Sequence, residues 1–177
     1  MKHAIFAIVA VLGACSPSED DKAETPKGVL PPGPETRTAA LTPADLPAAL
    51  AALVQKTVPN MTVAEVERKE REGRIYYDVE GSRPDGSAVE LDIQQIGDRF
   101  EVVEIQRDIV FADMPAEVRS AARAAAGAFV PERIIESRQT DGSVIYELFA
   151  AGQTAEPAME VRAKDGNAKV MTERWPH

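Results

Sequence analysis

The sequence predicts an α+β protein built as a tandem repeat of two units, in each of which a helix precedes a four-stranded antiparallel sheet and covers one face of it. Four short segments recur in the same order, 68 to 70 residues further along the chain. Each copy opens with a helix signal, after which the hydrophobic period changes from 3.6 residues to two. The recurring segments are residues 45–48 and 113–116, 75–79 and 143–148, 89–91 and 159–161, and Gly97 and Gly166. These segments place the first unit at residues 43–110 and the second at residues 111–177.

The N-terminal region has the pattern of an exported lipoprotein. In residues 1–14, Lys2 precedes an apolar run that ends at Leu12, and small residues lead to Cys15, which is typical of a signal peptide. The tetrad Leu12-Gly13-Ala14-Cys15 resembles the bacterial lipobox. We therefore expect cleavage before Cys15, lipidation of Cys15, and anchoring on the periplasmic side of the outer membrane rather than the inner one, since Ser16 follows.

Residues 15–42 carry the lipidated cysteine and a segment rich in Pro, Glu, Asp, Ser and Thr, with few large apolar side chains. Such a segment buries too little surface to offset the entropy of ordering it. The composition predicts a disordered tether between the lipid and the first unit.

Both predicted helices begin with the same residues. Asp45 and Asp113 suit the N-cap position, and Pro47 and Pro115 suit the first helical turn. Each helix then has one apolar stripe that predicts burial of one face. The stripes consist of Leu46, Leu50, Leu53, Val54 and Val58 in the first helix, and Val118, Ala121, Ala122, Ala125 and Phe129 in the second.

Eight short segments with a period of two follow the helices, and glycine turns between them predict antiparallel hairpins. The predicted strands are residues 63–68, 74–81, 87–94, 99–106, 133–138, 143–149, 158–163 and 168–174. Apolar and polar residues alternate, so that only one sheet face is apolar. We expect the helices to cover that face and the opposite, charged face to be open to water.

The net charge of −9 makes the protein acidic. An acidic surface repels phosphate backbones, so nucleic-acid binding is not expected, and contact with the membrane is expected through the lipid alone. A partner with a basic surface is the kind that this charge favours.

The helix openings, the Tyr-Tyr-Asp-Val and Ile-Tyr-Glu-Leu strands, and the glycine hairpins behind a lipobox together resemble the periplasmic PepSY-like proteins, a group similar to the β-lactamase inhibitor proteins. The resemblance covers residues 43–175. It implies two units whose sheets form one curved surface, and a role in binding or restraining another protein, such as a secreted peptidase. It implies no catalysis.

The residues themselves offer little catalytic chemistry after cleavage. His177 is then the only histidine, and no free thiol is left, which argues against Cys/His catalysis and the usual zinc sites. We therefore expect neither enzyme activity, nor a cofactor, nor a metal centre.

Carboxylates on the predicted open face are the main candidates for a site. On one face of a sheet, side chains on facing strands lie about 5 Å apart. Two like charges at this distance repel each other unless a cation or a basic partner neutralises them. The candidate protein-binding residues are Tyr76, Asp78, Glu80, Glu90, Asp92, Glu147 and Glu160. Tyr76, Ile145 and Phe149 share this face, either as part of a binding patch or as core between the two units.

The sequence thus predicts a non-catalytic, lipid-anchored periplasmic module that binds an envelope or secreted protein through an acidic sheet face. Two alternatives remain. One is an envelope lipoprotein that binds or senses cations such as calcium through the same carboxylates. The other is a structural lipoprotein with no discrete ligand.

Overall fold

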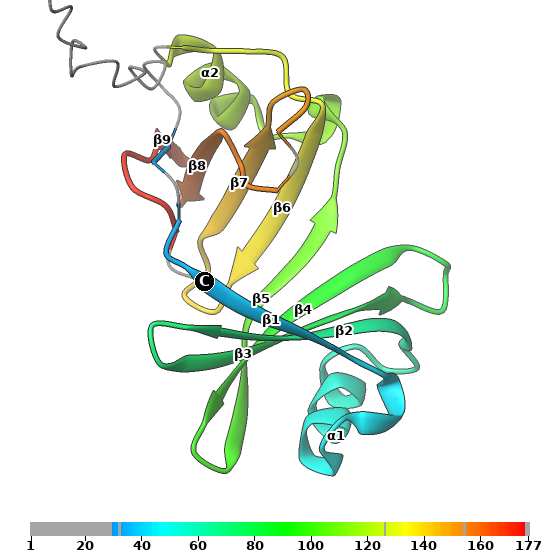
Figure 1. The fold of residues 1–177 in the computed structure, drawn as a ribbon. Helices are drawn as coiled ribbons and strands as arrows, with labels where there is room; N and C mark the ends of the chain where they lie inside the picture. Colours follow the sequence, from blue (N-terminus) through cyan, green and yellow to red (C-terminus); the bar gives the residue numbers. More distant parts are fainter. Residues whose placement is uncertain (1–29, 32, 126, 154, 176–177) are drawn as a thin grey trace, which may run out of the picture.

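The computed structural model describes residues 30–31, 33–125, 127–153 and 155–175 (Figure 1). Its main feature is one antiparallel sheet of nine strands, in which every strand pairs with the next one along the chain. The strands are β1 (Thr36–Leu41), β2 (Thr62–Arg71), β3 (Arg74–Ser82), β4 (Ala88–Ile96), β5 (Arg99–Asp108), β6 (Arg133–Gln139), β7 (Val144–Phe149), β8 (Met159–Lys164) and β9 (Asn167–Val170). The helices are α1 (Ala48–Thr57) and α2 (Ala116–Ala124), preceded by the short 3-10 helices η1 (Pro43–Asp45) and η2 (Phe111–Asp113).

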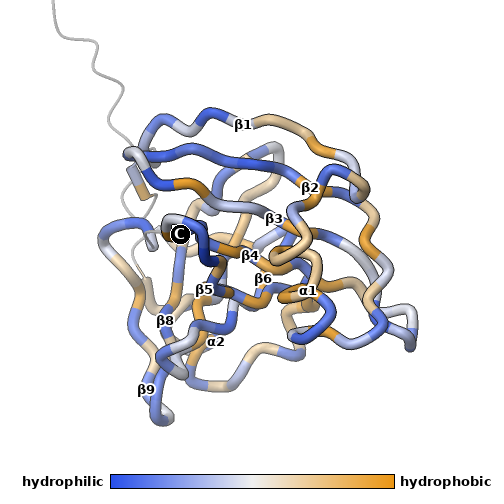
Figure 2. Tube along the Cα trace, turned by 90° about the horizontal axis from the view of Figure 1, so that it is seen from below, coloured by the Kyte–Doolittle hydropathy of each residue, from blue (hydrophilic) through white to orange (hydrophobic). Residues whose placement is uncertain are grey.

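The predicted fold class, an α+β repeat of two helix-plus-four-strand units, is therefore wrong. The described residues are mainly β, with one sheet, two short α-helices and two 3-10 helices. The sheet is continuous because β5 pairs with β4 along one edge and with β6 along the other, where Glu104–Asp108 lie opposite Ile135–Gln139. Figure 2 shows the result, with β1 and β2 on one side, β8 and β9 on the opposite side, and β5 and β6 between them.

The tether predicted for residues 15–42 extends too far toward the C-terminus. Thr36–Leu41 form β1, which pairs with β2 along its whole length. Leu41 packs against the first hydrophobic cluster, and burial of this side chain helps to fix the strand. Cys15 and the signal peptide lie outside the described residues.

The predicted strand positions are confirmed, because each of the eight predicted segments overlaps one of the strands β2 to β9. The apolar stripes pack inward as predicted, but both helices are shorter than the stripes, since Leu46, Val58, Ala125 and Phe129 lie outside α1 and α2. Leu50, Val54 and Val58 of the first stripe are buried in one cluster with the inner side chains of β2–β4, and Val118 and Ala122 of the second are buried in another with those of β6–β8.

Asp45 and Asp113 are not the N-caps of the α-helices, because each belongs to a short 3-10 helix that precedes the α-helix. Asp45 ends η1, where its carboxylate accepts hydrogen bonds from the backbone N–H of Thr42 at 3.1 Å and from the Thr42 hydroxyl at 2.5 Å. The helix α1 begins only at Ala48, with Pro47 at its N-cap. Asp113 likewise belongs to η2, and α2 begins at Ala116.

The sheet face opposite the helices is not open to water as predicted. The sheet bends at two β-bulges. One lies in β2 between Val63 and Glu65, and the other lies in β5, opposite Asp92 and Ile93 of β4. The face opposite the helices is consequently concave, and β1 lies in front of the β4 and β5 region (Figure 1). Most polar side chains near the middle of this face are buried.

Gly81 of β3 allows the close approach of β2 at the first bulge. A Cβ atom at this position would lie 2.1 Å from the Thr62 carbonyl oxygen, which is backbone and cannot rotate away. We therefore expect Gly81→Ala to lower the free energy of unfolding by about 1–3 kcal/mol, the usual range for a residue forced into a filled space. Urea unfolding followed by circular dichroism measures this. Ser82→Ala, one residue further along β3, is the control and should change stability by less than about 0.5 kcal/mol. Equal stabilities of the two variants would contradict the steric argument.

Candidate functional site

A row of carboxylates crosses the concave face from strand to strand. Asp78 of β3 lies directly opposite Asp92 of β4, which lies opposite Glu104 of β5. We call these three residues the carboxylate ladder. Neighbouring strands are about 4.8 Å apart, so the backbone alone holds three acidic side chains in a closely spaced line.

Two further pairs of acids face each other on the same side of the sheet. Glu80 pairs with Glu90 across β3 and β4, and Glu147 pairs with Glu160 across β7 and β8. The prediction that facing strands bring the candidate carboxylates together is confirmed by this register. Their exposure differs from the prediction, since Glu80 alone is exposed, Glu90 and Glu147 are half-buried, and Glu160 is buried.

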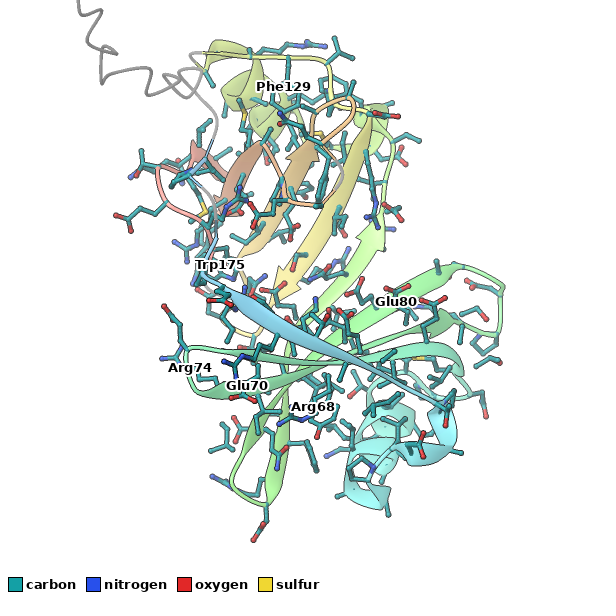
Figure 3. All side chains as sticks on the ribbon, in the orientation of Figure 1. Arg68, Glu70, Arg74, Glu80, Phe129 and Trp175 are labelled. Carbon is teal, nitrogen blue, oxygen red and sulfur yellow. The ribbon has the colours of Figure 1, made fainter. Side chains whose placement is uncertain are left out.

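These acids line a hollow between β1–β5 on one side and β7, β8 and the C-terminal segment on the other. It has two adjoining compartments of about 560 and 500 Å³, and we call them together the acidic hollow. Lys69, Asp78, Gln106, Glu147, Phe149 and Ala155 line both compartments. Trp175 lines the second compartment beside the beginning of β1, and Glu80 lines the first (Figure 3).

Arg174 holds the segment before β1 across this hollow. Its guanidinium group donates hydrogen bonds to the carbonyl oxygen of Pro31 at 2.6 Å and to that of Pro157 at 2.9 Å, and it forms an ion pair with Glu156 at 3.0 Å. The backbone N–H of Leu30 donates to the carbonyl oxygen of Ala158 at 3.1 Å. These bonds join the two ends of the described chain and partly enclose the second compartment.

All three ladder carboxylates have a buried oxygen without a hydrogen-bond partner. These atoms are Asp78 Oδ1, Asp92 Oδ1 and Glu104 Oε1, and the side chains belong to residues that are 6%, 6% and 2% exposed. The second oxygen of Glu104 accepts hydrogen bonds from the Ser137 hydroxyl and from the Gln106 amide, the latter at 2.8 Å. A buried charged oxygen without a partner is costly, so these three atoms mark a place where a donor is missing.

One lysine lies among these acids. The Lys69 ammonium forms an ion pair with Asp78 and lies 3.9 Å from a carboxylate oxygen of Glu67. Burial acts to lower the pKa of Lys69, but the attraction of Asp78, with smaller contributions from Asp92 and Glu90, outweighs it, so the pKa is raised. Lys69 is therefore charged at neutral pH and neutralises only part of the ladder.

Burial and mutual repulsion raise the pKa values of the acids in the hollow. Burial, together with Asp78 and Glu80, raises the pKa of Glu90 to about 7, and burial, together with Glu104 and Glu160, raises that of Glu147 to about 8. The pKa of Asp92 lies well above its ordinary value, first because of burial and then because of Asp78. Burial also raises the pKa values of Asp78 and Glu160, against the opposing effects of Lys69 and of the Trp175 backbone N–H. Several of these carboxyl groups thus hold protons near neutral pH.

Of the three apolar residues predicted on this face, Phe149 lines the hollow. Tyr76, Ile145 and Phe149 are buried, so they do not form the exposed binding patch that was one of the two predicted alternatives. The Arg71 guanidinium lies over the Tyr76 ring, 5.5 Å from its centroid. Phe149 contributes to both compartments, where its ring supplies an apolar wall.

Sequence reasoning missed Glu104, Lys69, Arg174 and Trp175 as parts of the site. Glu104 was hidden because Val103 is the extra residue of the β5 bulge, where the alternation of inner and outer side chains changes phase. The adjacent valines 102 and 103 are the one sequence signal of that change. Arg174 and Trp175 reach the hollow only through tertiary structure, which no local pattern reveals.

The described part of the chain holds no group of three or more His, Cys, Asp or Glu side chains placed to bind a metal ion together. Among the described residues there is likewise no helix with the length and hydrophobicity needed to cross a membrane.

Comparison of the chain with known protein families and with characterised proteins finds no match. The similarity to PepSY-like proteins therefore stays a prediction.

Proposed function

We propose that this protein is a non-catalytic, lipid-anchored binding module of the periplasm, and that it binds a positively charged ligand in the acidic hollow. The export signal and Cys15 support the periplasmic location. Ser16, the residue after the cysteine, favours the outer membrane. The single observation that carries the binding role is the set of three buried ladder oxygens without hydrogen-bond donors.

An ammonium or guanidinium group supplies what these oxygens lack. It brings both positive charge and several N–H donors, and charge-assisted hydrogen bonds are stronger than neutral ones. Lys69 already pairs with Asp78 in this way, which supports the hollow as a site for a primary ammonium group.

The enclosure of the ladder also restricts how a ligand binds. A flat basic protein surface cannot reach oxygens on residues that are about 95% buried. The ligand must instead insert protruding cationic groups into the hollow, and the first compartment, beside exposed Glu80 and half-buried Glu90, offers the more accessible approach.

Titration with a defined cationic probe tests this function. Trp175 is the only tryptophan of the sequence and lines the hollow, so its fluorescence reports occupancy. We expect a tetralysine peptide with blocked ends to change this fluorescence saturably at pH 8, and the same peptide with acetylated lysines to cause no change.

Matched variants locate the binding. Asp92→Asn removes a ladder charge at nearly constant volume and is expected to weaken binding of the lysine peptide at least tenfold. Glu101→Gln removes an exposed charge that does not line the hollow and should leave binding unchanged. Equal responses to the free and acetylated peptides, or equal affinities of the two variants, would contradict the binding of a cationic peptide in the acidic hollow.

A further inference from the structure

The spacing of the ladder carboxylates indicates the chemical class of the ligand, provided that the proposed cation-binding function holds. Asp78, Asp92 and Glu104 lie on three neighbouring strands, so their separation is the distance between strands, about 4.8 Å. Cationic side chains on one face of an extended peptide are separated by two residues, about 6.6 Å. A peptide lying across the ladder would thus fall out of step with it.

The second compartment of the hollow is strongly acidic. Seven carboxylates line it: Glu72, Asp78, Asp92, Glu104, Glu147, Glu156 and Glu160. The basic side chains that line it are Lys69, Arg71 and Arg174. Lys69 forms its ion pair with Asp78, Arg71 lies over the Tyr76 ring, and Arg174 is shared between Glu156 at 3.0 Å and Glu160 at 3.8 Å. No basic side chain forms an ion pair with Asp92, Glu104 or Glu147 in the described parts of the chain.

The same compartment has apolar walls between its charges. Phe149, Ala155, Pro157 and Trp175 line it together with the acids. Apolar walls with a few convergent polar groups are typical of small-molecule sites, and a volume of about 500 Å³ is within the usual range for such sites. Aromatic rings also attract ammonium groups and pack against methylene chains.

We propose that the second compartment binds a linear polyamine, which lies across β3, β4 and β5 with one ammonium group against each ladder carboxylate. Amines separated by three methylene groups match the spacing between strands, and a four-methylene link matches it when it is bent at one bond, which an extended peptide backbone cannot do. The methylene groups pack against Phe149 and Trp175. A triamine places its three charges against Asp78, Asp92 and Glu104. The unpartnered oxygens, which belong to three residues that line this compartment, receive the N–H donors that they lack.

Competition among amines tests the proposal. The purified protein is titrated at pH 8 with spermidine, 1,4-diaminobutane, spermidine acetylated at both primary amines, and calcium, with Trp175 fluorescence and calorimetry as readouts. We expect spermidine to bind at least tenfold more tightly than the diamine. The diacetylated compound and calcium should bind at least a hundredfold more weakly than spermidine.

Variants of the ladder connect binding to the assigned residues. Asp92→Asn and Glu104→Gln should each weaken spermidine binding at least tenfold, and Glu147→Gln, outside the ladder, should weaken it less. Glu101→Gln is the matched control and should have no effect. Thermal unfolding of each variant shows whether it is folded. If one ladder variant does not fold, the affinities of the other ladder variant and of Glu147→Gln still give the comparison.

The outcomes separate this inference from the proposed function. If tetralysine binds and spermidine does not, the polyamine assignment is overturned while the cation site stands. If the diamine or calcium binds as tightly as spermidine, the three-point match to the ladder is wrong. If neither tetralysine nor spermidine binds, both proposals are overturned.

Discussion

The free energy of unfolding is expected to fall by about 3 kcal/mol or more as the pH rises from 4.5 to 8 in the absence of ligand. Glu90 and Glu147 have pKa values of about 7 and 8 in the folded protein, against an ordinary value of 4.5. Between these values the folded state holds protons that the unfolded chain has lost. Because the folded state binds more protons, stability decreases with rising pH, and one pKa unit corresponds to about 1.4 kcal/mol.

Acids with lowered pKa values affect the free energy of unfolding in a different pH range. Hydrogen bonds from Thr42, Ser87 and Ser143 lower the pKa values of Asp45, Asp85 and Asp141, respectively. Their stabilising effect is present above about pH 4 and is lost below it, outside the window of interest. Urea unfolding at half-unit pH steps measures the predicted slope. Glu147→Gln should flatten it, and a stability that stays constant or rises from pH 5 to 8 would contradict the burial of these acids.

Asp92→Asn is expected to make the protein more stable at pH 8 by about 1–3 kcal/mol, although it weakens ligand binding. The Asp92 side chain is buried, and its Oδ1 lacks a partner while Asp78 and Glu104 lie on either side. Replacing a buried acid between two other acids by a neutral amide removes the cost of desolvating its ionised form and the repulsion from its neighbours. A residue retained at the expense of stability is typical of a binding site.

The same comparison distinguishes a binding role from a structural one. Chemical unfolding of Asp92→Asn, with Glu101→Gln as control, gives the change in stability, and fluorescence titration gives the change in affinity. A structural role for Asp92 predicts a loss of stability of similar size instead. Such a loss would argue against the acidic hollow as a ligand site.

Local sequence patterns predicted the elements well because they depend on short-range periodicity. Ile75, Tyr77 and Val79 alternate with Tyr76, Asp78 and Glu80, and the structure places the first set in the hydrophobic cluster and the second on the opposite face. The opposition of Asp78 to Asp92 follows from the Asp85-Gly86 hairpin turn, which fixes the register of β3 and β4.

Long-range features were not predictable from the same patterns. The pairing of β5 with β6 joins residues about 30 positions apart, and nothing local to Glu104 or Gln139 specifies it. Thr36–Leu41 form a strand only because β2 offers a free edge, in a composition that otherwise favours disorder. The burial of the acidic face results from the sheet's curvature and from Arg174, so alternation identified the acids but not their enclosure.

We expect the concave face to enclose protonated acids that bind a cation. Carbon-13 NMR titration of the side-chain carboxyl groups of Glu147 and Asp92 is the most direct test of this expectation. In the free protein, Glu147 should titrate with a midpoint near pH 8, and Asp92 well above its ordinary range. Saturating spermidine should move both midpoints toward lower pH, because a bound cation favours the ionised form. Midpoints near pH 4 in the free protein, unchanged by spermidine, would contradict both the enclosure of these carboxyl groups and their role in binding.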